Sequence, residues 1–333
     1  MSRIEHTRFS TLDLAPIRDD GDAGLALRNS LALAQHVEKL GFERFWVAEH
    51  HNMDGIASAA TSVLIGYLAA GTSRIRLGAG GVMLPNHAPL VIAEQFGTLE
   101  ALYPGRIELG LGRAPGADQF TAHALRRDRM GSADDFPADV EELQLLLGPR
   151  QRNQRVIAMP GVGSNVPIWL LGSSLFSAQL AAAKGLPYAF ASHFAPRYAH
   201  EAIRLYRENF RPSEVLDKPY VMLGVPLMTA DTDEHAEYLA TTAYQRILAL
   251  IRGQSLVLVP PVKSMQGKWL PHEQDAVGSF LGMALIGGPE KIRARLDVLL
   301  EQTQADELIF TCDFYETADR HRAFDILAGL RQG

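Results

Sequence analysis

The sequence predicts a (β/α)8 TIM barrel, and two observations support this prediction. Short apolar runs alternate with longer stretches of helical periodicity along nearly the whole chain, as parallel β/α units require. Eight such runs can be counted, and eight units favour a closed barrel over an open doubly wound sheet. No change in composition divides the 333 residues, so we expect one domain over residues 1–333.

Each predicted strand is a short apolar run bounded by glycine, proline or polar residues. The strands are expected at residues 9–14, 42–48, 75–83, 107–112, 168–171, 188–191, 220–228 and 307–311. Each predicted helix shows apolar positions at helical spacing, acidic residues near its start, or a glycine at its end. The helices are expected at residues 24–40, 57–70, 90–102, 134–147, 175–184, 196–210, 233–250, 290–302 and 318–330.

Residues 253–280 interrupt this alternation, with Pro260, Pro261, Trp269 and Pro271 among them. A long irregular segment inside a compact domain is usually functional or disordered. We interpret it as an insertion near the barrel mouth, where it would act as a lid.

Composition and charge exclude several classes of function. The net charge of −6 gives no basic footprint, so we expect neither nucleic acid nor an anionic membrane surface as partner. No apolar run approaches the roughly 20 residues of a membrane helix, and the N-terminus is polar. The single cysteine, Cys312, excludes an intramolecular disulfide and fits a reducing compartment. We therefore expect a cytoplasmic protein.

Polar residues follow the second predicted strand abruptly, in the order Glu49, His50, His51. In a TIM barrel, functional groups gather at the carboxyl ends of the strands. Successive strand residues point to opposite faces, so these three cannot all enter one site, and we expect no metal centre. One histidine facing the barrel mouth would suit proton transfer. The alternative is that both histidines are satisfied by structural hydrogen bonds.

A glycine-rich segment ends the third predicted strand and includes Gly80 and Gly81. Glycine allows a flat ligand to approach the backbone closely. A simple bulge or tight turn explains the same residues equally well.

Two further strand ends indicate an anion site. Arg113 follows the fourth strand, and Ser173 and Ser174 lie between the fifth strand and the next helix, where backbone N–H groups and the helix dipole favour phosphate. The alternatives are a surface salt bridge for Arg113 and ordinary helix capping by the serines. Together the three residues favour phosphate.

The glycines of residues 110–116 lack dinucleotide-fingerprint spacing. His193 and Cys312 follow the sixth and last strands, where we expect structural roles.

Three long motifs carry a family resemblance. They are EHH at residues 49–51, LGAGGVMLPNHAPLVIAEQFGTLEALYPGRIELGLGRAPG at residues 77–116, and LLGSS at residues 170–174 followed by GLPYAFASHF at residues 185–194. In this order they resemble the bacterial luciferase-like flavin-dependent oxidoreductases, and most of all their group 1 branch. The resemblance covers residues 10–330.

The resemblance implies a (β/α)8 barrel that binds FMN at its C-terminal face. It implies that His50 is a catalytic acid/base and that Gly80 and Gly81 form a cis peptide against the flavin. It also implies that Arg113, Ser173 and Ser174 contact the phosphate, and that the protein is a homodimer. Gly112 stands where luciferases proper carry a cysteine, so neither light emission nor a long-chain aldehyde substrate is implied.

The resulting hypothesis is a monooxygenase that uses reduced FMN and O2 on a small organic substrate. Because no nicotinamide site is evident, a flavin reductase in trans would supply the reduced flavin. The alternatives are an F420-dependent dehydrogenase of the same fold, a non-catalytic flavin-binding protein and a metal-dependent barrel hydrolase.

Overall fold

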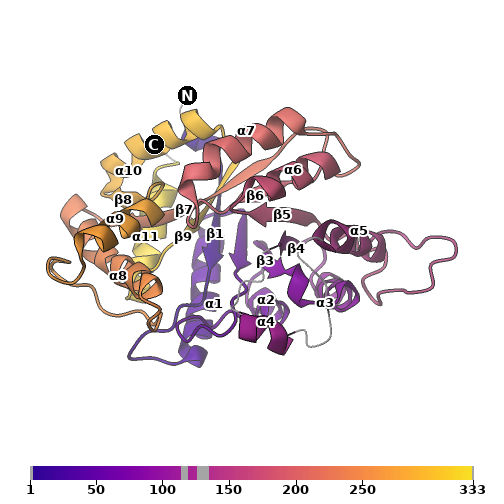
Figure 1. Ribbon diagram of the computed structural model, residues 1–333, viewed down its shortest axis with the longest axis horizontal. Helices are drawn as coiled ribbons and strands as arrows, with labels where there is room; N and C mark the ends of the chain where they lie inside the picture. Colours follow the sequence, from indigo (N-terminus) through magenta and orange to yellow (C-terminus); the bar gives the residue numbers. More distant parts are fainter. Residues whose placement is uncertain (1–2, 114–118, 126–134, 332–333) are drawn as a thin grey trace.

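Strands lie at the centre of the protein and helices surround them (Figure 1). Eight parallel strands pair into a closed ring. The computed structural model describes residues 3–113, 119–125 and 135–331. The ring runs β1-β2-β3-β4-β5-β6-β7-β9, and the pairing of β9 with β1 closes it. The predicted TIM barrel is confirmed.

The described residues form nine strands, which are β1 (Arg8–Asp13), β2 (Arg44–Val47), β3 (Arg76–Met83), β4 (Ile107–Gly112), β5 (Ile168–Gly172), β6 (Tyr188–Phe190), β7 (Val221–Thr229), β8 (Leu285–Gly287) and β9 (Glu307–Thr311). The α-helices are α1 (Ala23–Lys39), α2 (Thr61–Ala70), α3 (Pro89–Leu102), α4 (Gln119–Leu125), α5 (Phe136–Leu147), α6 (Leu175–Lys184), α7 (Ala199–Asn209), α8 (Asp233–Ile251), α9 (Pro271–Phe280), α10 (Pro289–Thr303) and α11 (Thr317–Gly329). Short 3-10 helices are η1 (Arg3–Glu5), η2 (Leu84–Asn86) and η4 (Pro196–Tyr198).

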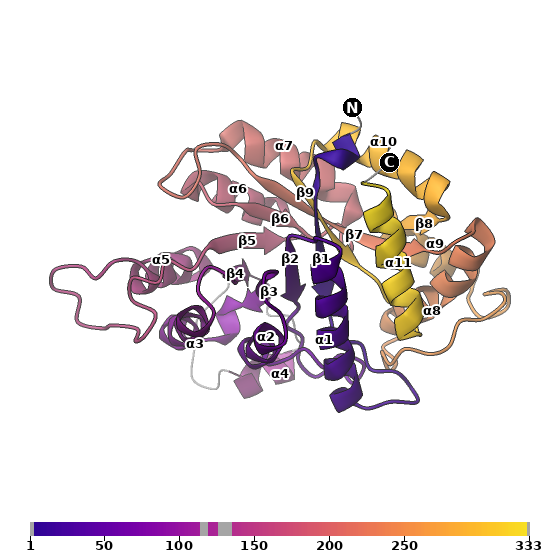
Figure 2. The same ribbon diagram turned by 180° about the vertical axis from the view of Figure 1, so that it is seen from behind.

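The helices surround the ring and bury its outer face. Figure 2 shows α1 and α11 side by side, so the first and last helices complete this outer layer, and the two helices pack together. The apolar residues of the layer and the outward-facing strand residues form one large buried cluster. The eight predicted strands are the eight strands of the ring.

Several predicted boundaries were wrong. The strand β8 was missed because three residues are too short to show a period; it pairs with the end of β7 and lies outside the ring. The helix α2 begins at Thr61, four residues later than expected, and α4 and α9 were not expected at all. Residues 114–116 of the glycine-rich segment and Asp134, the predicted start of a helix, lie outside the described residues.

A buried ionic cluster fills part of the barrel interior. The Arg44 side chain donates to Glu307 Oε1 at 2.7 Å and to Glu108 Oε2 at 2.6 Å. Its guanidinium also lies over the Trp169 ring, 4.7 Å from the centroid. Tyr220 donates to the second oxygen of Glu307 at 2.8 Å. Because Arg44 and both carboxylates are buried, their mutual contacts must offset a large desolvation cost.

The insertion is attached to two loops at the carboxyl end of the barrel. The Leu258 amide donates to the Ile17 carbonyl at 2.8 Å, and Leu256 donates to Asp54 Oδ1 at 3.0 Å. These bonds connect the insertion to the loops that follow β1 and β2. Its last ten residues form α9, which packs on α8. The irregular segment therefore lies across the strand ends.

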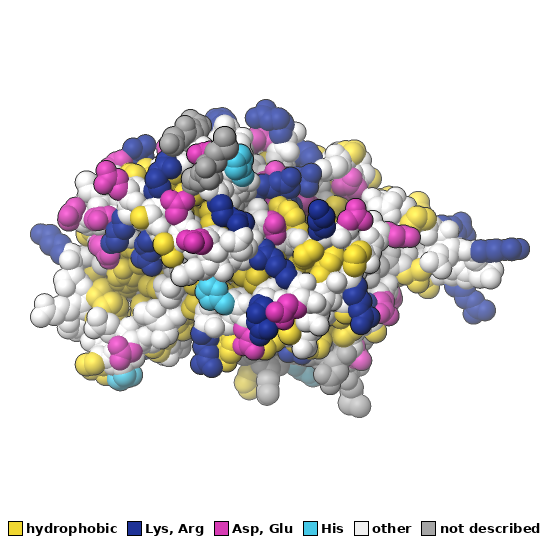
Figure 3. Space-filling model, turned by 90° about the horizontal axis from the view of Figure 1, so that it is seen from above, with side chains coloured by type: hydrophobic (Ala, Val, Ile, Leu, Met, Phe, Trp, Pro, Cys, Tyr) yellow, Lys and Arg dark blue, Asp and Glu magenta, His cyan; other side chains and the backbone are white. Residues whose placement is uncertain are grey.

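The surface seen in Figure 3 mixes acidic and basic side chains, and its projecting edge is basic. This projection is the loop between α5 and β5, which carries the exposed Arg150, Arg152 and Arg155. Among the helices of the described residues, none is long and apolar enough to span a bilayer.

Candidate active site

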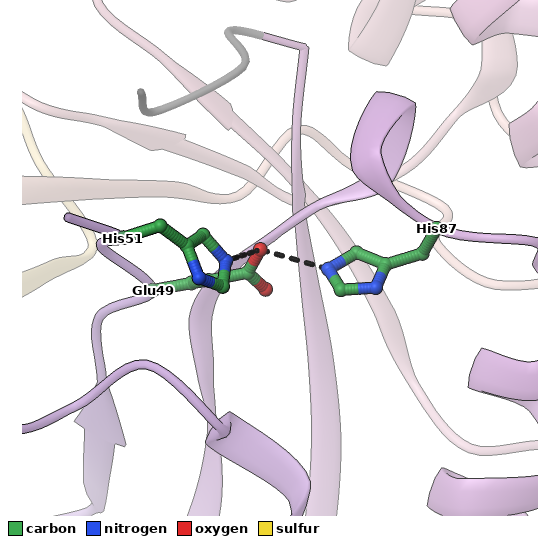
Figure 4. A group of neighbouring side chains, drawn as sticks. All are labelled: Glu49, His51 and His87. Atoms are coloured by element: carbon green, nitrogen blue, oxygen red, sulfur yellow. Dashed lines mark hydrogen bonds and ion pairs between the residues drawn. The ribbon is translucent and has the colours of Figure 1, made fainter. Parts of the chain in front are cut away.

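The three polar residues that follow β2 divide between two locations. Glu49 and His51 point toward His87, which comes from the loop after η2 (Figure 4). One oxygen of Glu49 accepts from His51 Nε2 at 3.0 Å and from His87 Nε2 at 2.8 Å. His50 faces the other way and lines two cavities. This division follows from the alternation of side chains along an extended segment.

Glu49 is a buried carboxylate held by two imidazoles. Burial alone would raise the pKa of Glu49, but the hydrogen bond and charge of His87, and then those of His51, outweigh burial and lower it. The cluster ties the end of β2 to the loop before α3. Because Glu49 and His51 are fixed on one side, His50 is directed to the other.

Glu49, His51 and His87 also have the donor atoms of a metal site, all lying within 4.8 Å of one another. Sequence reasoning considered only the contiguous residues and missed His87, which lies 36 positions beyond His51. Both imidazoles already bond to one carboxylate oxygen, which fits a hydrogen-bonded cluster. The absence of a metal stays a prediction.

The larger cavity has a volume of about 610 Å³ and lies at the carboxyl ends of the strands. Trp46, His50 and Gly80 line it, as do Phe190 and Phe194. The volume lies within the range of about 300–1,000 Å³ that ligand pockets occupy. Mostly apolar walls with few polar groups suit a flat aromatic ligand.

The peptide bond between Gly80 and Gly81 is cis, as the resemblance implied. The pairing of β3 with β4 shifts register across this bond, between Ala79 and Val82. A Cβ on Gly81 would lie 2.7 Å from the carbonyl oxygen of Gly110. No side chain larger than hydrogen fits between the two strands here.

Polar groups gather where β4 and β5 end. Arg113, Ser173 and Ser174 all line the larger cavity, and the Arg113 guanidinium lies 4.2 Å from the Phe176 ring centroid. Within the described residues, no carboxylate forms an ion pair with Arg113. Ser174 is the N-cap of α6, but its side chain makes no capping hydrogen bond. The described contacts thus include neither an ion pair of Arg113 with a carboxylate nor a side-chain capping bond of Ser174, and the phosphate site stays a prediction.

This end of the cavity has the donor groups that a phosphate, such as that of FMN, would need. A guanidinium, two hydroxyls and the first N–H groups of a ten-residue helix together provide charge and donors for a phosphate group. Cys312 is not among the residues that line this cavity, and burial raises the pKa of its thiol to about 12, so the thiol is protonated.

A smaller cavity of about 150 Å³ adjoins the larger one. The two share Leu14, His50, His193 and Phe194 as lining residues. Burial first, and then the charge of His50, lower the pKa of His193 to about 4, so this imidazole is neutral at pH 7. His193 was expected to be structural, yet it lies between the cavities.

Sequence reasoning missed two polar residues of the smaller cavity, Arg246 and Asp313. Asp313 comes just after β9, so the same strand-end argument that singled out His50 could have found it. Arg246 lies in the second half of α8, and nothing in its local sequence distinguishes it from a surface arginine.

Comparison with known proteins agrees with the fold and with the motifs. A family model described as luciferase-like monooxygenase matches residues 7–307. The "Luciferase-like monooxygenase" of Escherichia coli (strain K12) is 52% identical over 324 residues, covering 97% of each chain. The chain belongs to the luciferase-like monooxygenase family.

One more relative and one solved structure are similar to this chain. The N-acetyl-S-alkylcysteine monooxygenase of Bacillus subtilis (strain 168) is 43% identical over 236 residues, which is 69% of this chain and 70% of that one. The crystal structure of apo-MsnO8 superposes with a TM-score of 0.92 at 34% identity, covering 98% of this chain and 99% of that one.

Proposed function

We propose that this protein is an FMN-dependent monooxygenase that acts on a small organic substrate. The observation that carries the proposal is the arrangement of the larger cavity, which has a phosphate-type donor set at Arg113, Ser173 and Ser174 and meets a second cavity at His50. A family model described as luciferase-like monooxygenase supports the same reaction class.

Reduced FMN, when bound, supplies the two electrons with which O2 gives one oxygen atom to the substrate and the other to water. The chain would contribute binding, orientation and proton control. Arg113 and the serines would hold the phosphate, and Gly80 and Gly81 would leave room for the ring. His50, which lines both cavities, would donate or accept the proton at its imidazole.

The insertion would act as a lid by excluding water from the reacting groups. Leu256 and Phe280, from the two parts of the insertion, line the smaller cavity, and water-poor walls protect a reactive oxygen species from decay.

We further propose that a separate flavin reductase supplies the reduced FMN, because no dinucleotide fingerprint exists in the sequence. We retain the cytoplasmic location as a proposal, supported by the single cysteine.

The test supplies each reduced cofactor separately. The purified protein is mixed with reduced FMN or reduced F420, and cofactor oxidation and O2 uptake are recorded. We expect tight binding with FMN, and a rate of O2 uptake that differs from that of free reduced FMN, which reacts with O2 without an enzyme. Binding of F420 without binding of FMN would make the protein an F420-dependent dehydrogenase of the same fold, and binding of FMN without turnover of any substrate would make it a flavin carrier.

The reductase proposal has its own test. Anaerobic mixing with FMN and NADH or NADPH should leave the flavin absorbance unchanged until a flavin reductase is added. Rapid bleaching that saturates with NAD(P)H would show a self-sufficient enzyme.

We also propose a homodimer that forms through α2 and α3. Large apolar side chains are exposed on these neighbouring helices, with Val63 73% and Leu102 65% exposed, together with Tyr67 and Val91. Exposed apolar patches of this kind mark association surfaces. Analytical ultracentrifugation should give a dimer for the wild type and a monomer for Val63→Glu. A monomeric wild type would contradict the proposal.

A further inference from the structure

The smaller cavity is apolar over most of its wall. Residues of α8, α9 and the insertion supply much of this lining, including Ile247, Leu250, Leu256 and Phe280. Its volume of about 150 Å³ equals that of a protein cavity known to accept benzene. The cavity therefore suits an apolar group of six or seven carbon atoms.

One charged side chain in the wall has donors to spare. Arg246 is only 8% exposed, and its Nη1 lies 2.9 Å from Asp313 Oδ2. Even so, Nη1 is buried without a hydrogen bond of good geometry in the described part of the chain. Nη1 carries two of the five N–H donors of the guanidinium, so these donors lack a well-aligned acceptor among the described residues.

A buried guanidinium with unused donors is costly unless an acceptor reaches it. Asp313 balances the charge of Arg246, but its side chain is 29% exposed and it provides a single contact. A carboxylate is the group whose geometry best matches a guanidinium, through two parallel hydrogen bonds. Arg246 and Asp313 line only the smaller cavity, whereas His50 and His193 line both.

We propose that the smaller cavity binds the substrate as a small monocarboxylate, with Arg246 as the residue that holds the carboxylate. This inference rests on the proposed monooxygenase function. Asp313 positions Arg246 and competes weakly for its donors. With the carboxylate at Arg246, the apolar body of the substrate extends toward His50 and the larger cavity, where oxygen transfer would occur.

Isothermal titration calorimetry with hexanoate, hexanamide and 1-hexanol tests the proposal on protein with and without saturating oxidised FMN. Hexanoate should bind at least tenfold more tightly than the two neutral probes. In Arg246→Met this preference should fall to within twofold. Asp313→Asn should strengthen hexanoate binding several-fold, because it removes the competing carboxylate and leaves Arg246 its full charge.

The control is Arg322→Met, which removes an exposed arginine that pairs with Asp231 on the surface. It should leave all three affinities unchanged. Circular dichroism checks that each variant is folded. If Arg246→Met does not fold, the stronger hexanoate binding expected in Asp313→Asn still tests whether Arg246 holds the carboxylate.

Equal affinity for hexanoate and 1-hexanol in the wild type would overturn the proposal, as would weaker hexanoate binding in Asp313→Asn. Failure of all three probes to bind would also overturn it. These readouts need no oxygen and no turnover. Hexanoate binding without FMN binding would therefore contradict the monooxygenase function alone, and FMN binding without carboxylate preference would contradict this inference alone.

Discussion

The backbones of Gly55 and Leu256 are in such close contact that a Cβ on Gly55 would lie 2.1 Å from the carbonyl carbon of Leu256. The loop after β2 and the insertion therefore touch at a point where only glycine fits. The insertion is thus fixed over the smaller cavity by backbone contact in addition to its hydrogen bonds.

We expect Gly55→Ala to displace the insertion, because the added Cβ would overlap the Leu256 backbone. Limited proteolysis should cut residues 254–270 faster than in the wild type, and the Leu258 amide should exchange its hydrogen faster. Gly278→Ala is the matched control, because a Cβ there meets nothing within 4 Å. Unchanged protection of Leu258 in Gly55→Ala would refute the tight contact.

Arg44→Met should destabilise the barrel by about 3–5 kcal/mol. The variant leaves Glu108 and Glu307 buried with no guanidinium between them. Urea unfolding followed by circular dichroism measures the loss. Arg322→Met breaks an exposed pair and should cost about 0–1 kcal/mol. A loss below about 1 kcal/mol for Arg44→Met would mean that the cluster relaxes or takes up water.

The pKa of His193 predicts how stability depends on pH. In the unfolded chain a histidine has a pKa of about 6.5, whereas in the folded protein burial lowers the pKa of His193 to about 4. Between these values the unfolded state binds a proton that the folded state does not, so folding stability falls as pH decreases from 6.5 to 4. One proton gives a slope of at most about 1.4 kcal/mol per pH unit.

Urea unfolding at several pH values checks this slope. His193→Asn should flatten it, whereas His272→Asn, which changes an exposed histidine of α9, should not. An identical slope in wild type and His193→Asn would show that His193 titrates in the folded protein as it does in the unfolded chain.

His50→Asn should separate binding from turnover. The loss of a general acid or base lowers the rate by about 10²–10⁴-fold, while FMN affinity should stay within about twofold because the proposed phosphate contacts lie elsewhere. Steady-state rates on any substrate that the wild type oxidises, together with FMN titration, measure both. Full activity of a folded His50→Asn protein would show that His50 has a structural role and is not the catalytic acid or base.

The fold could be predicted from the sequence because strand and helix periods are local properties. The eight ring strands are each marked by their own residues, whereas β8, with three residues, leaves no periodic trace. The insertion was recognised from its prolines, but α9 within it was not, because Pro271 marks the first turn of that helix as readily as a loop.

The site could be predicted in part, because some of its residues directly follow strands in the sequence. His50, Arg113 and the two serines sit directly after strands, so their position at the barrel mouth follows from the alternation. The contact of Arg246 with Asp313 spans 67 positions, and that of Glu49 with His87 spans 38. Such pairings depend on how loops and helices meet, which one sequence does not show.

The most direct test of the account compares FMN with riboflavin, which lacks the phosphate. In the wild type and in Arg113→Ala, quenching of flavin fluorescence gives the four dissociation constants. Arg113→Ala should weaken FMN about ten- to a hundredfold, because a charge-assisted contact contributes about 1.5–3 kcal/mol. Riboflavin should bind both proteins equally. If the variant weakens riboflavin as much as FMN, Arg113 does not bind the phosphate and the assignment of the larger cavity is wrong.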